Sequence, residues 1–256
     1  MSVEPDQEGR FKSTTIGHAD HLFLSPLSLE KADWLIGLLE LPSGGVVLDI
    51  ACGKAGFLRR LLAKRATAKG IGVDINAAFL AEAAAGAARE AILDRLTLVR
   101  QAAEEYVAAL QPVDAILCFG GSQAVGGFDG LIAVARRMLA PRGQLLIGDG
   151  FWQQPPAPAY LALLGATADE LTDHAGNATR LRQAGFKVLA TAAASTDEWD
   201  DYEARYCRAK TRWALAHPED PDSAGLLEQA QTWHDGYLRW GRATLGFGWY
   251  LASMAN

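Results

Sequence analysis

The strongest constraint on this chain is a regular alternation of short apolar runs and longer amphipathic segments between residues 46 and 149. The apolar runs have the length of buried strands, and the segments between them carry apolar residues at helical spacing. The predicted strands span 46–51, 70–75, 95–101, 113–119 and 144–149, and the predicted helices span 57–67, 77–92, 103–110 and 129–140. Strand–helix–strand units close with right-handed crossovers and build a parallel sheet with helices on both faces. The sequence therefore predicts a doubly wound, Rossmann-like α/β fold with a mostly parallel sheet.

The chain on either side of this alternation departs from it. Residues 1–27 are mostly polar and predict a mobile N-terminal arm or lid, whereas residues 28–256 predict the α/β domain itself. We expect helical insertions in this domain at about residues 151–185 and 195–243, the second of which forms a cap over the carboxyl edge of the sheet. The further predicted elements are helices at 28–39, 159–173, 177–184, 195–217 and from about 222 to 242, and strands at 186–194 and 244–253.

The loop after the first predicted strand holds residues that indicate a ligand. In an open α/β sheet, ligands bind beyond the carboxyl ends of the strands, at the point where the strand order reverses. Here Asp49 ends the strand, and Gly53 and Gly56 let the backbone turn tightly against a ligand. The next helix points its free N–H groups at an anion, and Asp49 is placed to accept hydrogen bonds from an ammonium group. This loop suits an amino-acid zwitterion better than a pyrophosphate.

A second acidic residue follows the second predicted strand. Asp74 lies 18 residues after Gly56, and a parallel fold brings it beside the first loop. A carboxylate at this position accepts hydrogen bonds from both hydroxyls of a ribose. The two positions together predict a ligand that combines a nucleoside with an amino acid. The structural alternatives are a turn acid at Asp49 and a surface acid at Asp74.

With these positions in order, the sequence resembles the class I S-adenosylmethionine (SAM) dependent methyltransferases. VLDIACGKAGFL resembles their motif I, and GVDI resembles their acidic second-strand motif. DAILCFGGS and LAPRGQLLIGD resemble the motifs of the fourth and fifth strands, and the resemblance covers roughly residues 28–150. It implies SAM as the cofactor, with Asp49 at its methionine end and Asp74 at its ribose. The closing FGWYL is similar to the antiparallel last strand of the family.

The sequence departs from the family pattern in two places. Ala51 and Ala55 stand at the first and third glycines of D-x-G-x-G-x-G, and alanine carries a conformational penalty only where φ is positive. Ala102 stands where the family often has an aspartate that contacts adenine, so adenine recognition falls to backbone groups or to Gln101. The cofactor-binding residues that the resemblance implies are Asp49, Ala51, Gly53, Gly56, Asp74, Ile75, Gln101, Ala102, Ala103, Cys118, Phe119 and Gly120.

Four residues are candidates for a role in catalysis. Gln123 follows the fourth strand and either orients an acceptor or stabilises its loop. Asp149 ends the fifth strand and either takes a proton from a nucleophile, pairs with an amine or is structural, and Tyr160 is either an acid or a half-buried tyrosine. His18 belongs to the arm, where it is a lid contact, a base for methyl acceptance or a solvated residue. We predict no metal site, because the two arm histidines and the aspartate between them lack a fourth ligand.

Tryptophan and tyrosine are concentrated late in the chain, where positions from 199 onward carry nine of the thirteen. On each of the two predicted cap helices these residues share one face. The two aromatic faces either pack against each other or supply rings that line a pocket for an aromatic or cationic acceptor.

Composition narrows the range of partners. The formal charge of −6 and the pI near 5.4 provide no field that attracts phosphate backbones, so nucleic acid is not an expected partner. No segment approaches the roughly 20 apolar residues of a membrane span, and the N-terminus lacks the pattern of a secretory signal. Three cysteines without a CxxC pair indicate neither a disulfide framework nor a zinc ribbon. We expect a soluble, cytoplasmic protein.

Together these observations predict an enzyme that transfers the methyl group of SAM to a small-molecule acceptor. The reaction is an in-line displacement from a sulfonium, so the protein mainly aligns the nucleophile and excludes water. Two alternatives are a SAM-binding protein without methyltransferase activity and a nicotinamide-dependent Rossmann oxidoreductase. The oxidoreductase predicts G-x-G-x-x-G directly after the first strand and no acid at Asp49. The sequence predicts no particular oligomeric state.

Overall fold

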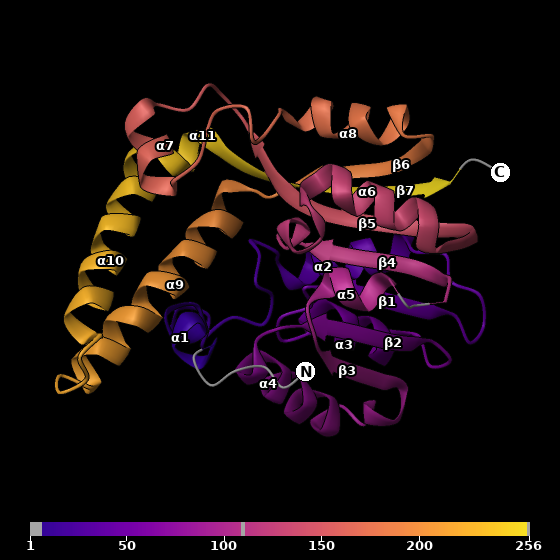
Figure 1. Cartoon of the computed structure of the whole chain (residues 1–256), viewed down its shortest axis with the longest axis horizontal. Helices are drawn as coiled ribbons and strands as arrows, with labels where there is room; N and C mark the ends of the chain where they lie inside the picture. Colours follow the sequence, from indigo (N-terminus) through magenta and orange to yellow (C-terminus); the bar gives the residue numbers. More distant parts are fainter. Residues whose placement is uncertain (1–6, 109–110, 255–256) are drawn as a thin grey trace.

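The computed structural model describes residues 7–108 and 111–254 of the chain (Figure 1). Its seven-stranded sheet has the order β3-β2-β1-β4-β5-β7-β6. Strands β1 to β5 are parallel to one another, and β7 is antiparallel to both of its neighbours. The predicted doubly wound sheet with an antiparallel last strand is confirmed. The strands are β1 (Val46–Ile50), β2 (Lys69–Asp74), β3 (Leu96–Arg100), β4 (Val113–Phe119), β5 (Leu139–Trp152), β6 (Phe186–Ala193) and β7 (Leu245–Met254).

Parts of three predicted segments fall outside the described residues. They are the first six residues of the arm, the last two of the helix expected at 103–110, and the last two of the α/β domain. Within the ranges that the structure does describe, no helix is both long and apolar enough to cross a membrane.

Helices cover both faces of the sheet, and each packs an apolar stripe against the strands. On one face, α2, α3 and α4 bury side chains such as Leu35 and Leu58 in one core cluster. On the other face, α5, α6 and α8 bury side chains such as Leu131 and Leu181 in a second cluster. These helices are α2 (Leu29–Leu38), α3 (Gly56–Lys64), α4 (Ala77–Arg89), α5 (Ala103–Ala108), α6 (Gly127–Met138) and α8 (His174–Gln183); short 3-10 turns η1 (Leu93–Arg95) and η2 (Ser122–Val125) precede β3 and α6.

The segment after β5 differs most from the prediction. The apolar pattern predicts one helix over 159–173, whereas α7 covers only Pro158–Leu164. Gly165 ends α7 with a φ of 64°, in the left-handed region that favours glycine. The next helix begins at His174 rather than at 177, because the Asp173 carboxylate accepts a hydrogen bond from the Gly176 amide at 2.6 Å. Local capping residues therefore set both boundaries.

Strand β5 also extends beyond its predicted range of 144–149. It continues to Trp152 because β7 pairs with it as far as Leu245. A strand edge is stable only where its amides find partners, and the antiparallel neighbour supplies them here. The extension carries β5 past the point where the parallel strands end.

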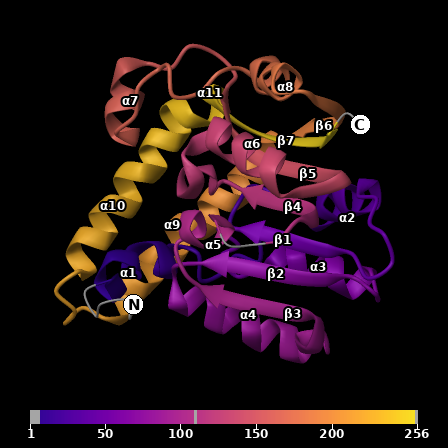
Figure 2. The same ribbon diagram turned by 45° about the vertical axis from the view of Figure 1, so that its right-hand side comes forward.

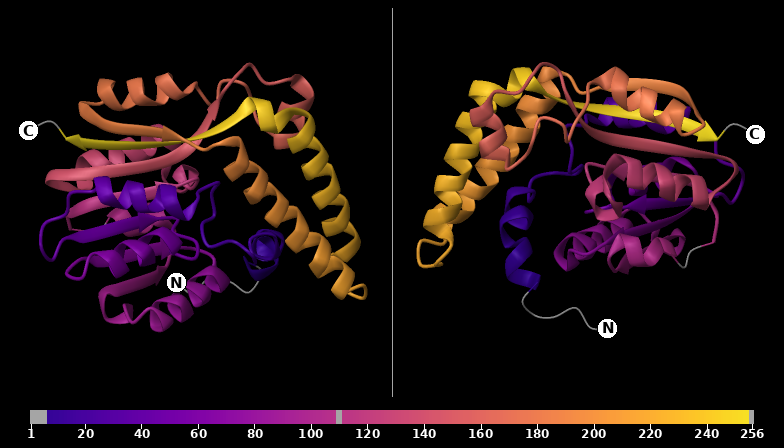
Figure 3. Two further views of the ribbon diagram at one scale, coloured as in Figure 1. Left: turned by 180° about the vertical axis from the view of Figure 1, so that it is seen from behind. Right: turned by 45° about the horizontal axis from the view of Figure 1, so that its top comes forward.

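A pair of long helices, α9 (Thr196–Ala216) and α10 (Ser223–Gly236), is inserted between β6 and β7. A capping box formed by Ser195 and Glu198 starts α9, as predicted. The two helices pack against each other, and the views from front and back show them side by side (Figures 1 and 3). The arrowheads of β1, β2 and β3 point toward them (Figure 2), so the pair lies beyond the carboxyl edge of the sheet. We call this pair the cap.

The end of the second cap helix is less regular than the prediction of a continuous helix to residue 242. A π-helical turn over Tyr237–Gly241 follows α10, and α11 (Arg242–Thr244) leads into β7. A Cβ atom on Gly241 would lie 2.7 Å from the hydroxyl oxygen of Tyr160, so α7 packs tightly against this turn. Such turns are frequent at functional sites, where they redirect side chains.

The arm contains a helix that the sequence did not predict, α1 (Gln7–Gly17), which packs against α9. Lys12 binds the carboxylates of Asp220 and Asp222 at 2.6 and 2.7 Å, and the Ser13 hydroxyl donates to the side chain of Gln229 at 2.9 Å. Because its sequence has few apolar residues, α1 depends on these tertiary contacts. The remainder of the arm runs from α1 past the strand ends to α2 (Figure 3).

Candidate active site

The loop between β1 and α3 has a strained backbone. Ala51, Gly53 and Ala55 adopt φ values of 53°, 53° and 50°, all in the left-handed region. The two alanines at the family's glycine positions therefore carry the conformational penalty, which is about 1 kcal/mol or more for each. Strain of this kind persists where the surrounding structure holds the loop in place, and it is common at ligand sites.

Asp49 and Asp74 end the two adjacent strands β1 and β2. The Asp74 carboxylate accepts hydrogen bonds from the amides of Gly53 at 2.7 Å and Asn76 at 2.8 Å. Burial raises the pKa of Asp74 despite these hydrogen bonds. Asp49 is 5% exposed, and burial raises its pKa well above the usual range, with a further contribution from the Asp74 charge. Two desolvated acids side by side favour a ligand that brings positive charge and hydroxyl donors.

The end of β3 lies beside Asp74 and Ile75. The amide of Gln101 donates to the carbonyl oxygen of Asp74 at 3.2 Å, which places residues 101–103 next to the acid. The Gln101 side chain donates to Glu105 at 3.4 Å, and Ala103 is buried at the start of α5. The predicted adenine-side residues are therefore gathered at one edge of the crevice.

The end of β4 contacts the same loop. A Cβ atom on Gly121 would lie 2.4 Å from the Cβ of Ala51, so these two loops touch directly. Phe119 packs edge-on against Phe57 with ring centroids 4.8 Å apart. Gly120 has a φ of 71°, and its amide donates to Gly148 at 2.7 Å. Cys118 is different, because its side chain is buried in the core beneath α6 and burial raises the pKa of its thiol well above the usual range.

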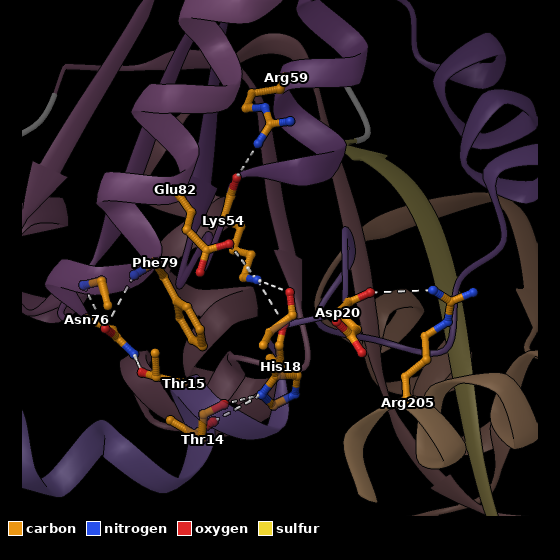
Figure 4. Close-up of polar contacts among 12 residues, drawn as sticks. Thr14, Thr15, His18, Asp20, Lys54, Arg59, Asn76, Phe79, Glu82 and Arg205 are labelled. Atoms are coloured by element: carbon orange, nitrogen blue, oxygen red, sulfur yellow. Dashed lines mark hydrogen bonds and ion pairs between the residues drawn. The ribbon is translucent and has the colours of Figure 1, made fainter. Parts of the chain in front are cut away.

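His18 is buried between the arm, α9 and α4. Its Nδ1 atom lies 2.8 Å from the Thr14 carbonyl oxygen, so Nδ1 carries the proton, and Nε2 accepts from the Tyr202 hydroxyl at 2.9 Å. Burial lowers the pKa of His18 to about 4, so the ring is neutral at physiological pH. Figure 4 shows the contact of His18 with Thr14. Because the other ring nitrogen bonds to Tyr202, His18 holds the arm to α9 in this conformation.

The other three catalytic candidates lie in different surroundings. Gln123 is exposed in the turn after β4. Asp149 ends the parallel part of β5, where it accepts from the Gly150 amide at 2.7 Å and from the Ser122 side chain, and burial raises its pKa. Tyr160 is buried on α7 against Trp240, and burial raises the pKa of its hydroxyl. Asp149 is the candidate that lies at the ends of the central strands.

Two polar residues at the site were missed by the sequence analysis. Asn76 caps α4 by accepting from the Ala78 amide at 3.0 Å, and its Nδ2 donates to the Thr15 hydroxyl in α1 at 2.9 Å. An asparagine between a strand acid and a helix is a capping signature, so this residue was within reach of the sequence. Lys54, inside the β1–α3 loop, donates a hydrogen bond to the arm and forms an ion pair with α4. No pattern in the sequence predicts these partners.

The aromatic residues of the cap face the last strand. Trp199 stacks on Tyr237 at 6.4 Å and meets Phe247 edge-on at 6.5 Å. The indole N–H groups of Trp199 and Trp249 are buried and find no hydrogen-bond partner among the described residues. Unpartnered buried donors are costly, and they are typical of places that bind a ligand or water.

A cavity of about 520 Å³ lies between the arm and the first turns of α9. It is lined by apolar arm residues such as Phe23 and Leu27 and by polar residues such as His21, Ser25 and Tyr202. Its volume is that of a site for one small molecule.

The fold and these loops define a class I SAM-binding protein. Comparisons with known proteins agree with this class. Residues 47–143 match the methyltransferase domain family. The uncharacterized protein YjhP of Escherichia coli is 28% identical over 237 residues, which cover 91% of this chain and 94% of that protein.

Solved structures agree with this placement. A SAM-dependent methyltransferase from Geobacter sulfurreducens, in complex with S-adenosylhomocysteine (SAH), has a TM-score of 0.89 and 26% identity, covering 95% of this chain and 98% of that one. One from Thiobacillus denitrificans, also with SAH, has a TM-score of 0.88 and 26% identity and covers all of both chains. The chain is a SAM-dependent methyltransferase, and SAM is its cofactor. The oxidoreductase alternative finds no support.

Proposed function

We propose that this methyltransferase acts on a small-molecule acceptor by in-line displacement. The observation that carries the proposal is that the chain closes its own carboxyl edge with the cap and α1 (Figure 2). A macromolecular acceptor needs an open approach to the cofactor, whereas here the cap and α1 lie over the strand ends (Figure 2). The nearby cavity of about 520 Å³ between the arm and α9 has the size of a small molecule. The formal charge of −6 also disfavours a nucleic-acid acceptor.

The residue roles follow the geometry of the strand ends. We assign Asp49 to the ammonium group of the methionine end of SAM and Asp74 to the ribose hydroxyls, because both are buried acids beside the strained loop. Backbone groups of residues 101–103 are assigned to adenine. We assign Phe119 and Gly120, next to the Gly121 contact with the β1–α3 loop, to the side of the site that would hold the sulfonium. Bound there, SAM supplies an electrophilic methyl group.

The acceptor side is assigned to aromatic residues of α9, the π-helical turn and β7. Trp199, Tyr237 and Phe247 pack into an apolar wall, and the buried indole N–H groups of Trp199 and Trp249 have no hydrogen-bond partner among the described residues. This wall favours an acceptor with an aromatic or amine-bearing body. Burial raises the pKa of Asp149, which makes its carboxylate a stronger base, and we assign it to accept a proton from an attacking N–H or O–H group.

A fractionation experiment tests the acceptor class. The purified protein is incubated with methyl-labelled SAM and a cell extract, and the products are separated by ultrafiltration. Label in the low-molecular-weight filtrate supports the proposal, and mass spectrometry of that fraction identifies the acceptor. Label confined to retained protein or nucleic acid would overturn the small-molecule acceptor while leaving the family membership intact.

A further inference from the structure

Lys54 lies inside the cofactor loop, between Gly53 and Gly56, yet its side chain is directed at the arm (Figure 4). The residue is 4% exposed, so its ammonium group is almost fully withdrawn from water. Burial of a charged amine is costly unless each of its donors finds a partner.

All three donors of Lys54 have partners. Nζ donates to the carbonyl oxygens of His18 at 2.8 Å and Ala19 at 3.2 Å, and it pairs with the Glu82 carboxylate of α4 at 2.7 Å. The ring of Phe79, 6.0 Å from Nζ, lies on another side. The ammonium group therefore joins three segments: the cofactor loop, α4 and the arm.

The two carbonyl groups have a particular position in the arm. They directly follow α1, which ends at Gly17, and therefore lie at the negative end of the helix. A positive charge just beyond this end interacts favourably with the helix dipole. Lys54 thus caps α1 from outside the arm.

The arm also contacts the glycines of the same loop. A Cβ atom on Gly56 would lie 2.2 Å from the Leu22 carbonyl oxygen, and one on Gly53 would lie 2.7 Å from the Leu24 side chain. From behind, the Arg59 guanidinium donates to the Lys54 carbonyl oxygen at 3.2 Å. The loop conformation and the seating of the arm are therefore parts of one packed unit.

We propose that Lys54 is a positioning residue that couples the arm to the cofactor loop, so that SAM or SAH binding and ordering of the arm reinforce each other. The loop that receives the methionine end keeps its shape only while Lys54 is held, and the arm is held only while the loop has that shape. Two segments coupled in this way give positive cooperativity between cofactor binding and closure. The inference rests on the cofactor assignment and is independent of the acceptor.

Hydrogen exchange and calorimetric titration with SAH test the coupling in the full chain. In the wild type, SAH is expected to slow amide exchange both in the cofactor loop and in arm residues 11–24. In Lys54→Met, we expect the arm to exchange rapidly, SAH no longer to protect it, and the Kd for SAH to rise about 10-fold, the equivalent of about 1.4 kcal/mol. Lys64→Met on α3, which removes an exposed ion pair with Asp33, is the matched control and should change neither quantity.

Each contrary outcome has a separate meaning. Unchanged arm exchange in Lys54→Met, or a freed arm with unchanged affinity for SAH, would overturn the coupling alone. Failure of the wild type to bind SAH would overturn the cofactor assignment as well. If Lys54→Met does not fold, Lys54→Gln, which keeps two neutral donors, is expected to give intermediate arm exchange, and wild-type exchange in that variant would equally overturn the coupling.

Discussion

The cofactor loops and the cap face each other across the carboxyl edge of the sheet, but they are held by different kinds of contact. The cofactor side is held largely by backbone groups of adjacent strand ends, such as the Cys52 amide, which donates to the Val73 carbonyl oxygen at 3.0 Å. The cap side is built from side chains that are far apart in the sequence. The Tyr237 hydroxyl donates to Asp200 at 2.6 Å, and the Trp233 indole donates to Glu203 at 2.7 Å.

This difference has a functional consequence. A backbone-built site depends on strand register and loop shape, so it keeps one geometry for one cofactor. A side-chain-built cap can change its lining by substitution without moving the strand ends. We therefore expect cap substitutions to alter stability and acceptor binding, and substitutions in the cofactor loops to alter affinity for the cofactor.

The largest expected effect is on the cap side, in Trp199→Ala. Trp199 is 9% exposed among Tyr237, Phe247 and Tyr202, and removal of a buried tryptophan lowers the free energy of unfolding by about 3 to 5 kcal/mol. Urea denaturation measures this loss, and the exposed Trp34→Ala on α2 serves as a control with little change. We expect the folded variant to bind SAH like the wild type. Loss of SAH binding would show that the cofactor site depends on the cap.

Asp74→Ala, on the cofactor side, is expected to have its main effect on SAH binding rather than on stability. We assign the Asp74 carboxylate to both ribose hydroxyls, so its loss should remove two charge-assisted hydrogen bonds and raise the Kd for SAH about 100-fold or more. Calorimetric titration measures the change. Asp114→Ala is the matched control. Asp114 also accepts a hydrogen bond from a backbone amide, that of Val46 at 2.8 Å, but it lies beside the start of β1, away from the cofactor loops. Wild-type affinity in Asp74→Ala would refute the ribose assignment.

The two sides also differed in how far they could be predicted from sequence. Alternation of strands and helices is local, so the sheet, its order of elements and the acids at the ends of β1 and β2 followed from the pattern. The positions of Asp49 and Asp74 needed only the rule that parallel strands end at one edge. The family resemblance covers this same part of the chain.

What could not be predicted depends on contacts between distant residues. Helix α1 has little helical pattern of its own and is stabilised by partners such as Asp220, more than 200 positions away. The partners of Lys54 belong to the arm and to α4, so a lysine within the loop motif gave no signal of its role. The positive φ values of Ala51 and Ala55 are set by loop geometry that residue type alone does not report.

A pH-dependent effect on the cap is the third prediction. Burial raises the pKa of Glu203 from 4.5 to about 7, so the folded state holds this proton more tightly than the unfolded chain. The resulting stabilisation is complete below pH 4.5 and is lost as the pH rises through 7. Glu203→Gln has no carboxyl group to ionise, so relative to wild type it should gain at most about 3 kcal/mol between pH 4.5 and 8. Denaturant titrations at the two pH values measure the gain.

The control for that measurement is Glu228→Gln, an exposed position on α10 of the same cap. Its difference from wild type should be the same at both pH values. If the stability difference between Glu203→Gln and wild type is the same at both pH values, the Glu203 carboxylate must be stabilised by a partner in the folded cap. The nearby Lys210, itself buried and with its pKa lowered to about 8 by burial, is the cation that would act as this partner.

The smallest expected effect is in the cofactor loop. The substitution tests whether the strained backbone at Ala51 is needed for SAH binding. Ala51 has a φ of 53°, so Ala51→Gly removes a steric penalty and should stabilise the fold by less than about 1 kcal/mol, since glycine also raises the entropy of the unfolded chain. The same substitution at Ala85, inside α4, should destabilise by a similar amount. If Ala51→Gly stabilises the fold but weakens SAH binding, the alanine is retained because it packs against Gly121 and holds the β1 and β4 loops together. If it leaves SAH binding unchanged, the strain comes from the loop shape itself, and the methyl group of Ala51 contributes nothing to the cofactor site.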